Sequence, residues 1–407
     1  MNQIEERVEK LLKNDKNICN HCLGRKLSDI VDGEDNQTRG KIIKEKLNLK
    51  ETNTCFICKN TFKYLDTEKI LKKVNKKIKK LNLEFNTFIV GTKISKEIIE
   101  TDKKINEDLN LNVEVIKKEL NRIIGKKIEK NLNKEVEFDN PDIVIMVNLK
   151  KIPESTEVKI QINPLFIEGK YNKFQRNIPQ TKWPCTKCKG KGCEECNGTG
   201  KQYPESVEEL ISQHILEETQ GKDAKFHGAG REDIDVRMLG TGRPFVLEIK
   251  EPKKRNINLK EIEEKINKIN KNKTKYTNLK FTKRHRKAEI KQTSPDTYKI
   301  YKAQIKCEKP IKPEELEKLK ELKIIKQRTP TRVSHRRADK IRIKEVKNIE
   351  PKYINKHEFE IIIKTEGGLY IKELISGDNN RSQPSISEIL NNQSTCEFLD
   401  VIEVGAK

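Results

Sequence analysis

The pattern of hydrophobic and polar residues predicts alternating helices and strands in the first part of the chain. Apolar residues recur at helical spacing around residues 67–80 and 114–130. Residues 85–90 have the composition of a strand, and the β-branched, apolar run at 143–149 predicts a strand that is buried. A short charged helix is expected within residues 1–17. Together these elements predict an α+β module.

Strand patterns dominate the second part of the chain. Apolar residues alternate with polar ones, or β-branched residues cluster, at residues 245–249, 299–305, 341–343 and 359–365. Helical spacing returns around residues 259–270 and after the capping-box sequence Ser-Val-Glu-Glu at 206–209. We therefore expect a mixed, mostly antiparallel sheet with few helices, so that the fold class of the whole chain is α+β.

Net charge suggests a partner. The 407 residues carry a formal charge of +23, and only 33% of them are hydrophobic. This length predicts two or three domains. The excess of cations favours a nucleic-acid partner, because phosphate contacts release counterions; a lysine-rich genome is the less specific explanation. No signal peptide and no apolar run of about 18 residues is recognisable, so we expect a cytoplasmic protein without a membrane segment. The sequence leaves the oligomeric state open.

Most of the ten cysteines lie in Cys-x-x-Cys pairs. In a chain without a secretion signal, such pairs are more typical of metal sites than of disulfides. Two pairs fit a four-sulfur structural zinc site with a helical insert between them: Cys19, Cys22, Cys55 and Cys58. Two further pairs form a repeated Cys-x-x-Cys-x-Gly-x-Gly motif and predict a second zinc site: Cys185, Cys188, Cys193 and Cys196. The alternative in each case is a set of free thiols.

An unusual run of acids and arginines lies between glycines at residues 226–245. Arg231, Asp233, Asp235 and Arg237 occupy every second position, so on an extended backbone all four side chains point to one face. Guanidinium groups on either side of a carboxylate favour its ionised form and fix the orientation of its side chain. The alternative is a surface salt-bridge ladder at the end of a strand, and the spacing alone does not separate the two.

Two runs of basic residues, 281–287 and 329–339, are candidate phosphate contacts. They supply the arginines that we expect to bind RNA: Arg284, Arg286, Arg332, Arg336 and Arg337. The alternative role of both runs is a solvated basic surface.

Several stretches together resemble the tRNA pseudouridine synthases of the archaeal and eukaryotic type that act on the T arm. They are the N-terminal cysteine knuckles, residues 178–185, the Gly-Arg-Glu-Asp-x-Asp-Val-Arg run at 230–237, and residues 327–339 and 368–378. The resemblance implies a THUMP-containing RNA-binding region, a pseudouridine synthase fold, and isomerisation of uridine to pseudouridine at positions 54 and 55 of tRNA. It also implies a zinc-knuckle segment at 1–65, a THUMP-like domain at 66–180, a Cys-rich knuckle at 181–204 and a catalytic domain at 205–407.

The resemblance assigns roles to individual residues. Asp233 matches the catalytic aspartate, and Tyr301, in Lys-x-Tyr-x-Ala, matches the tyrosine that packs on the target base. Tyr370 and Lys372 match the last motif, whose basic group partners the aspartate. Arg231 and Lys372 are therefore expected to orient Asp233. The loop at 377–384 departs from the family's tighter Gly-Asp-x-Gly-Arg-Thr, because its second glycine is missing.

Isomerisation of uridine involves no redox change and no transfer to a second molecule, so we expect no organic cofactor. Zinc held by four thiolates has no open position for water and is expected to be structural. The alternative is a non-enzymatic zinc-ribbon RNA-binding protein in which the acidic run is only structural. Another THUMP enzyme, such as a methyltransferase or thiouridine synthase, agrees less well, because the sequence contains neither a Rossmann glycine motif nor a phosphate loop.

Overall fold

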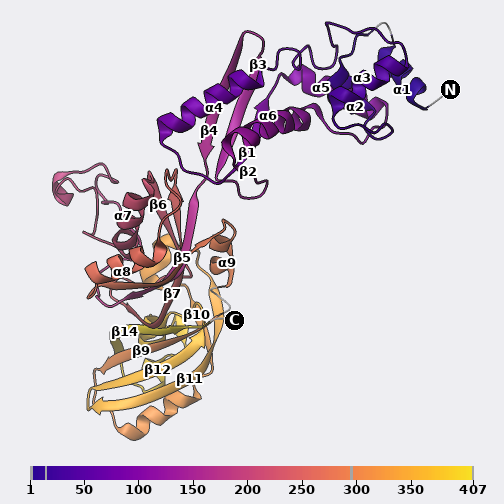
Figure 1. Ribbon diagram of the computed structural model, residues 1–407. Helices are drawn as coiled ribbons and strands as arrows, with labels where there is room; N and C mark the ends of the chain where they lie inside the picture. Colours follow the sequence, from indigo (N-terminus) through magenta and orange to yellow (C-terminus); the bar gives the residue numbers. More distant parts are fainter. Residues whose placement is uncertain (1–2, 14–15, 294–296, 406–407) are drawn as a thin grey trace. The chain divides into compact units, whose positions relative to one another are not determined.

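The computed structural model describes residues 3–13, 16–293 and 297–405 (Figure 1). The chain divides into two compact units. The first contains the residues up to Asn163 together with Lys253–Arg255, and the second contains Pro164–Pro252 and the residues from Asn256 on.

The first unit is an α/β module preceded by short helices. Its helices are α1 (Gln3–Leu12), α2 (Asn20–Lys26), α3 (Asn36–Lys46), α4 (Thr67–Leu81), α5 (Lys96–Asp108) and α6 (Ile116–Leu132). Its strands are β1 (Thr87–Lys93), β2 (Glu135–Val136), β3 (Ile143–Lys151) and β4 (Ser155–Ile162). They form one sheet in the order β2-β1-β3-β4, in which only the β3–β4 pair is antiparallel.

The sequence pattern located most of these elements correctly. Helix α4 begins where Asp66 accepts a hydrogen bond from the backbone N–H of Lys69 (2.8 Å) and ends at Asn82, which adopts the left-handed conformation. Strand β3 is buried at every second residue from Ile143 to Leu149, as its β-branched composition predicts. The helical insert predicted between the first two cysteine pairs is α3. Helix α5 was not predicted.

The second unit is built on one large sheet. Its strands are β5 (Leu165–Lys173), β6 (Asp223–Gly228), β7 (Arg237–Lys250), β8 (Thr274–Thr282), β9 (Tyr298–Cys307), β10 (Ile324–Arg328), β11 (Ile341–Asn355), β12 (Glu358–Glu366), β13 (Ser382–Gln383) and β14 (Ser394–Val404). The order is β13-β10-β11-β12-β9-β14-β7-β5-β8, and β6 pairs with β7 outside this path. All pairs are antiparallel except β14 with β7. The sheet is thus mixed and mostly antiparallel, as expected.

Short helices and connections complete the second unit. The α-helices are α7 (Val207–Thr219), α8 (Leu259–Ile269), α9 (Arg286–Thr293), α10 (Ile371–Ser376) and α11 (Ile386–Ile389). The 3₁₀ turns are η1 (Glu194–Cys196), η3 (Pro313–Glu321) and η4 (Thr331–Arg336). Helix α7 begins at the predicted capping box, where Ser206 accepts from the backbone N–H of Glu209 (3.2 Å), and it buries Val207, Ile211 and Ile215. Among the described residues, none of the helices is long and apolar enough to cross a membrane.

Two local features differ from or extend the sequence prediction. Strand β5 lies within the range expected for the RNA-binding region, yet it pairs with β7 and β8 of the second unit. The loop after α10 lacks the family's second glycine, and Asp378, Asn379 and Asn380 all adopt positive φ values there (44°, 55° and 64°). Asp and Asn tolerate this conformation better than other residues with a side chain, which explains how the loop turns without the glycine.

Candidate active site

The acidic run forms a loop between β6 and β7. The expectation that Arg231, Asp233, Asp235 and Arg237 share one face of an extended strand is wrong. Residues 231–236 are not in a strand, and a turn is closed by the bond from the Val236 N–H to the Asp233 carbonyl (3.1 Å). The preceding Gly230 has φ +80°, which its missing Cβ allows. The four side chains therefore do not share one face: Asp233 and Asp235 both lie near Lys372, whereas Arg237 pairs with Asp400.

Glu232 anchors this loop in the interior of the second unit. Its carboxylate accepts hydrogen bonds from the hydroxyl of Tyr171 (2.8 and 2.9 Å) and forms an ion pair with Nε of Arg243 (3.0 Å). All three side chains are buried. Gln180 donates from Nε2 both to the Tyr171 hydroxyl (2.8 Å) and to the carbonyl of Gly230 (3.0 Å). The buried network fixes the backbone at Gly230 and Glu232, on either side of Arg231. Asp233, which follows Glu232, is outside this network, and its side chain is partly exposed.

A cleft of about 990 Å³ opens beside this loop. All five residues predicted to act on the substrate line it: Asp233, Tyr301, Tyr370, Lys372 and Arg231. Two of the predicted RNA-binding arginines, Arg332 and Arg337, line it too. These residues come from the β6–β7 loop, β9, η4 with the residue after it, and the start of α10. The structure therefore brings together segments that are separated by up to 141 positions in the sequence.

Asp233 is held by two cations in the cleft. Its Oδ2 lies 2.8 Å from Nη1 of Arg332 and 3.8 Å from Nζ of Lys372. The same lysine is closer to Asp235, at 2.6 Å, and Arg332 also pairs with Glu373 at 2.5 Å. Arg332 is thus the nearer partner of Asp233, a contact that the sequence could not indicate, because the two residues lie far apart in the chain. Side-chain exposure of Asp233 is 30%, so a ligand in the cleft can reach it.

Ionisation of the neighbouring groups follows from burial and charge. Burial opposes the charged form of Asp235, but hydrogen bonds and charge from Lys372 outweigh it, so the pKa of Asp235 lies below its ordinary value. Burial raises the pKa of Tyr301 to about 12, which keeps its hydroxyl protonated. On the same strand, burial and the charges of Arg243 and Lys344 lower the pKa of Lys299 to about 8. The cleft therefore combines a paired carboxylate, a neutral tyrosine and several cations.

The remaining predicted RNA-binding arginines differ in their surroundings. Arg286 forms ion pairs with Glu168 (2.6 Å) and Glu289 (2.9 Å). Arg284 is exposed, and its side chain has no ion pair or hydrogen bond within residues 16–293 and 297–405. The side chain of Arg336 lies outside the described part of the chain. Arg237 pairs with Asp400 of β14 at 2.6 Å and not with the acids of its own loop.

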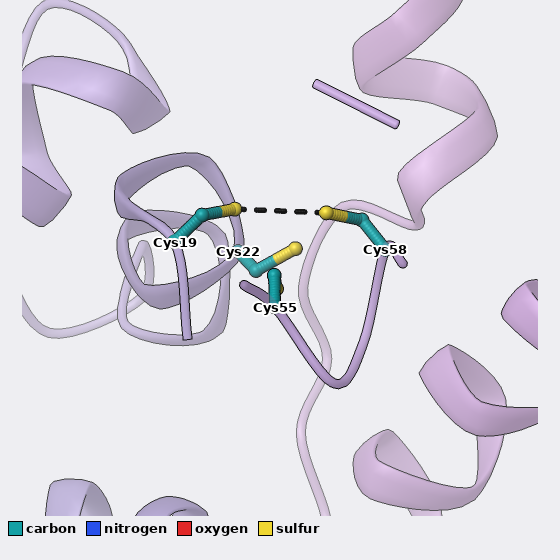
Figure 2. Close-up of side chains that lie close together, drawn as sticks. All are labelled: Cys19, Cys22, Cys55 and Cys58. Carbon is teal, nitrogen blue, oxygen red and sulfur yellow. Dashed lines mark hydrogen bonds between the residues drawn. The ribbon is translucent and has the colours of Figure 1, made fainter. Parts of the chain in front are cut away.

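The first four-cysteine group fits a tetrahedral metal ion. Figure 2 shows Cys19, Cys22, Cys55 and Cys58 converging from two segments of the chain, and their sulfurs lie within 4.8 Å of one another. The sulfurs of Cys19 and Cys58 are 3.7 Å apart, and four sulfurs at about 2.3 Å from a zinc ion would be about 3.8 Å apart. Arg25 is buried and donates to the sulfur of Cys22 (3.6 Å), which offsets the negative charge of the thiolates.

The second four-cysteine group has similar spacing and is less buried. Its sulfurs are separated by 3.9 Å (Cys185 and Cys193), 3.8 Å (Cys188 and Cys196) and 3.6 Å (Cys193 and Cys196). The glycines of the repeat turn backbone N–H groups toward sulfur: Gly192 donates to Cys188 and Gly200 to Cys196, both at 3.2 Å. Both groups could hold a metal ion.

Comparison with known proteins decides the family. Residues 166–405 match the family described as Pus10, C-terminal, and residues 70–148 match the Pus10 THUMP domain of archaea. The tRNA pseudouridine synthase Pus10 of Methanothermobacter marburgensis is 48% identical over 403 residues, covering 99% of both chains. That of Methanosphaera stadtmanae is 49% identical over 367 residues, covering 88% of this chain and 90% of the relative. The chain belongs to the Pus10 family of tRNA pseudouridine synthases. The Pus10 of Pyrococcus furiosus, at 39% identity with 98% of both chains covered, extends the same relationship.

Membership of the Pus10 family settles the class of the protein. It is an enzyme, a tRNA pseudouridine synthase with an archaeal THUMP domain, and its substrate is RNA. The alternative of a non-enzymatic RNA-binding protein is thereby removed, as are the methyltransferase and thiouridine synthase alternatives. The cleft beside the β6–β7 loop lies within the part of the chain that matches the Pus10 C-terminal family.

Proposed function

We propose that this enzyme isomerises uridines 54 and 55 in the T arm of tRNA and that Asp233 is the catalytic carboxylate. The observation that supports the role of Asp233 is its position: a partly exposed carboxylate on a loop anchored by buried Glu232, paired with Arg332 and facing the same cleft as Tyr301. The assignment of the T arm rests on the resemblance described above, and the division of the chain into four segments remains a prediction.

The isomerisation requires one carboxylate and a substrate that is held in a fixed position. The C1′–N1 bond breaks, the uracil turns, and a C1′–C5 bond forms; C5 loses its proton to solvent and N1 gains one. The target uridine leaves its stack at a cost of a few kcal/mol. Stacking on Tyr301 would offset about 1–3 kcal/mol of this cost. Asp233 would act as nucleophile or base on the exposed nucleoside, with Arg332 and Lys372 fixing its direction.

Metal ions would have a structural role in this scheme. We propose that the two four-cysteine groups bind zinc, because closed sets of four thiolates at these sulfur separations suit it. Such sites leave no open coordination position. None of these eight cysteines is among the described residues that line the cleft. No step of the isomerisation is assigned to the metal.

Mapping of pseudouridine in an unmodified tRNA transcript tests the proposal. We expect modification at positions 54 and 55 with the wild-type enzyme and none with Asp233→Asn, which keeps the shape of the side chain and should still bind tRNA. Asp235→Asn is the matched control, since this acid lies on the same loop and is tied to Lys372; it should retain most of the activity. Release of the C5 hydrogen at the wild-type rate by Asp233→Asn would refute the catalytic assignment. Modification confined to another arm would refute the T-arm assignment.

A further inference from the structure

Lys299 is a buried lysine in the wall of the cleft. It lies on β9 two residues before Tyr301, so both side chains are on the same face of the strand, and both line the cleft. Only 8% of Lys299 is exposed. Throughout the described parts of the chain, no hydrogen bond or ion pair involves its amine. Buried lysines are normally paired. Nζ of Lys299 has no such partner but is not among the fully enclosed polar atoms, so its amine is open to the cleft.

The surroundings of Lys299 have an excess of positive charge. Arg243 and Lys344 both oppose its protonation, and Glu232 is the one acid that favours it. Glu232 is already engaged by Arg243 and the Tyr171 hydroxyl. Among the residues that the structure describes, the amine of Lys344 has only a long contact with Glu366 (3.9 Å). On its open side, the cleft adds further groups that titrate or carry charge: His227, Lys291, Arg337, Arg342 and Asp233. Asp233 is the one acid of this set, and its carboxylate is already engaged by Arg332 and Lys372.

A ligand that completes this site should carry negative charge. A neutral uracil carbonyl would accept a hydrogen bond but would leave the excess charge unbalanced. A phosphodiester supplies one negative charge and several acceptors. Residues two apart on a strand are about 7 Å apart, so a nucleotide whose base lies on Tyr301 can place a neighbouring backbone phosphate near Lys299.

We infer that Lys299, with Lys344 beside it, forms a subsite that binds a backbone phosphate of the tRNA next to the target uridine. The inference rests on the proposed position of that uridine against Tyr301 and Asp233. In this proposal Lys299 is a substrate-binding residue that contributes a positive charge to the wall of the cleft. In the free enzyme the largely buried cation faces the cleft without a protein partner, and the substrate phosphate would supply that partner on binding.

The salt dependence of tRNA binding separates a phosphate contact from other roles. Equilibrium binding of an unmodified transcript would be measured across salt concentrations with the full chain carrying Asp233→Asn, so that no turnover occurs. Adding Lys299→Met should weaken binding and reduce the slope of log K against log salt by about 0.7–0.9, whereas Lys299→Arg should preserve the slope. Lys306→Met, an exposed lysine of the same strand on the opposite face, is the control and should change the slope less.

Each result decides the inference. Weaker binding with an unchanged slope would mean that Lys299 contacts a neutral group, and unchanged binding would mean that it contacts no substrate; either outcome overturns the proposal. A thermal melt of Lys299→Met separates misfolding from lost contact, because removal of an unpaired buried charge should raise stability. Because the readout is tRNA binding, the phosphate subsite can fail this test while Asp233 remains the catalytic residue. Residual pseudouridine formation by Asp233→Asn would instead count against the catalytic assignment alone.

Discussion

Arg332 lies closer than Lys372 to the proposed catalytic carboxylate: its Nη1 is 2.8 Å from Oδ2 of Asp233, whereas Nζ of Lys372 is 3.8 Å away. Lys372 instead makes its short contacts with Asp235 (2.6 and 2.8 Å). Arg332 is therefore the nearer cation to Asp233, and Lys372, which contacts both acids, is the nearer cation to Asp235. This arrangement predicts unequal effects when either cation is removed.

Replacing Arg332 should reduce catalysis more than replacing Lys372. Loss of a hydrogen bond between charged groups typically costs about 1.5–3 kcal/mol, so Arg332→Gln should slow single-turnover pseudouridine formation roughly 10–100-fold. Lys372→Gln should slow it less, and Arg332→Lys should recover part of the rate. If Arg332→Gln raises only the KM and leaves the single-turnover rate intact, Arg332 is a phosphate contact, as the sequence alone suggested.

Removing the buried charge of Glu232 should lower the free energy of unfolding of the second unit. Glu232→Gln leaves the guanidinium of Arg243 buried without its anion, and breaking a buried pair from one side typically costs about 3–5 kcal/mol. Urea unfolding followed by tryptophan fluorescence or circular dichroism would measure the loss. Asp223→Asn, which breaks the exposed pair with Lys250, is the control and should cost far less. Equal effects of the two variants would contradict the anchoring role of Glu232.

Neighbouring arginines should contribute unequally to tRNA binding. Arg284 is exposed and unpaired within the described residues, whereas Arg286 is tied to Glu168 and Glu289. Arg284→Ala should therefore lower the salt slope of tRNA binding by up to about 0.9, as expected for one lost phosphate contact. Arg286→Ala should change the salt slope less, because this arginine is already neutralised by Glu168 and Glu289. A larger loss for Arg286 would show that its ion pairs open when RNA binds.

The two cysteine groups should release metal at different rates. In the first group, Cys22, Cys55 and Cys58 are buried, whereas Cys188, Cys193 and Cys196 of the second are partly exposed. Metal analysis should give two zinc ions per chain, and a colorimetric chelator should remove them in two phases. Cys193→Ser should abolish the fast phase and Cys55→Ser the slow one. A single phase carrying both ions would contradict the difference in accessibility.

Lys299 should make stability depend on alkaline pH. Its pKa is about 8 in the folded chain against an ordinary 10.5, so the folded protein loses this proton before the unfolded protein does. The cost of burying the charge is therefore fully present below pH 8 and disappears as pH rises toward 10.5. Lys299→Met should raise the free energy of unfolding by roughly 3 kcal/mol at pH 7 and by progressively less above pH 8. Denaturant unfolding at several pH values measures this, and a gain independent of pH would contradict it.

Secondary structure followed from the sequence wherever periodicity was strong. The predicted helices around 67–80, 114–130 and 259–270 correspond to α4, α6 and α8, and the strand at 143–149 corresponds to β3. Helix α5 was not predicted because its apolar residues are few: they are Ile98, Ile99 and Ile105, and only Ile98 is buried. The pattern also could not show that β5 joins the sheet of the second unit, since strand pairing depends on partners far away in the chain.

The candidate site was located by motif, but its geometry was not. Period-two spacing suggested a strand at residues 231–237, whereas tertiary contacts of Glu232 and the flexibility of Gly230 impose a loop. Arg332 was recognised only as part of a basic run. Its contact with Asp233 arises from the packing of η4 against the β6–β7 loop, and no local pattern encodes that. Lys299 is the first residue of the Lys-x-Tyr-x-Ala stretch, but the sequence could not show its burial, because a lysine on a strand normally reaches solvent.

The position of β14 has a consequence for how the enzyme is made. This strand lies between β9 and β7 and pairs with Arg237 and Met238, which directly follow the loop that carries Asp233. A ribosome produces β14 after all the other described strands of this sheet. Until β14 emerges, the backbone N–H and C=O groups of β7 and β9 that it will bind remain unpaired. Such exposed strand edges can pair with other chains. The loop that carries Asp233 therefore gains its β14 neighbour only late in translation, and premature termination before residue 394 should yield an aggregation-prone product, not a partially active one.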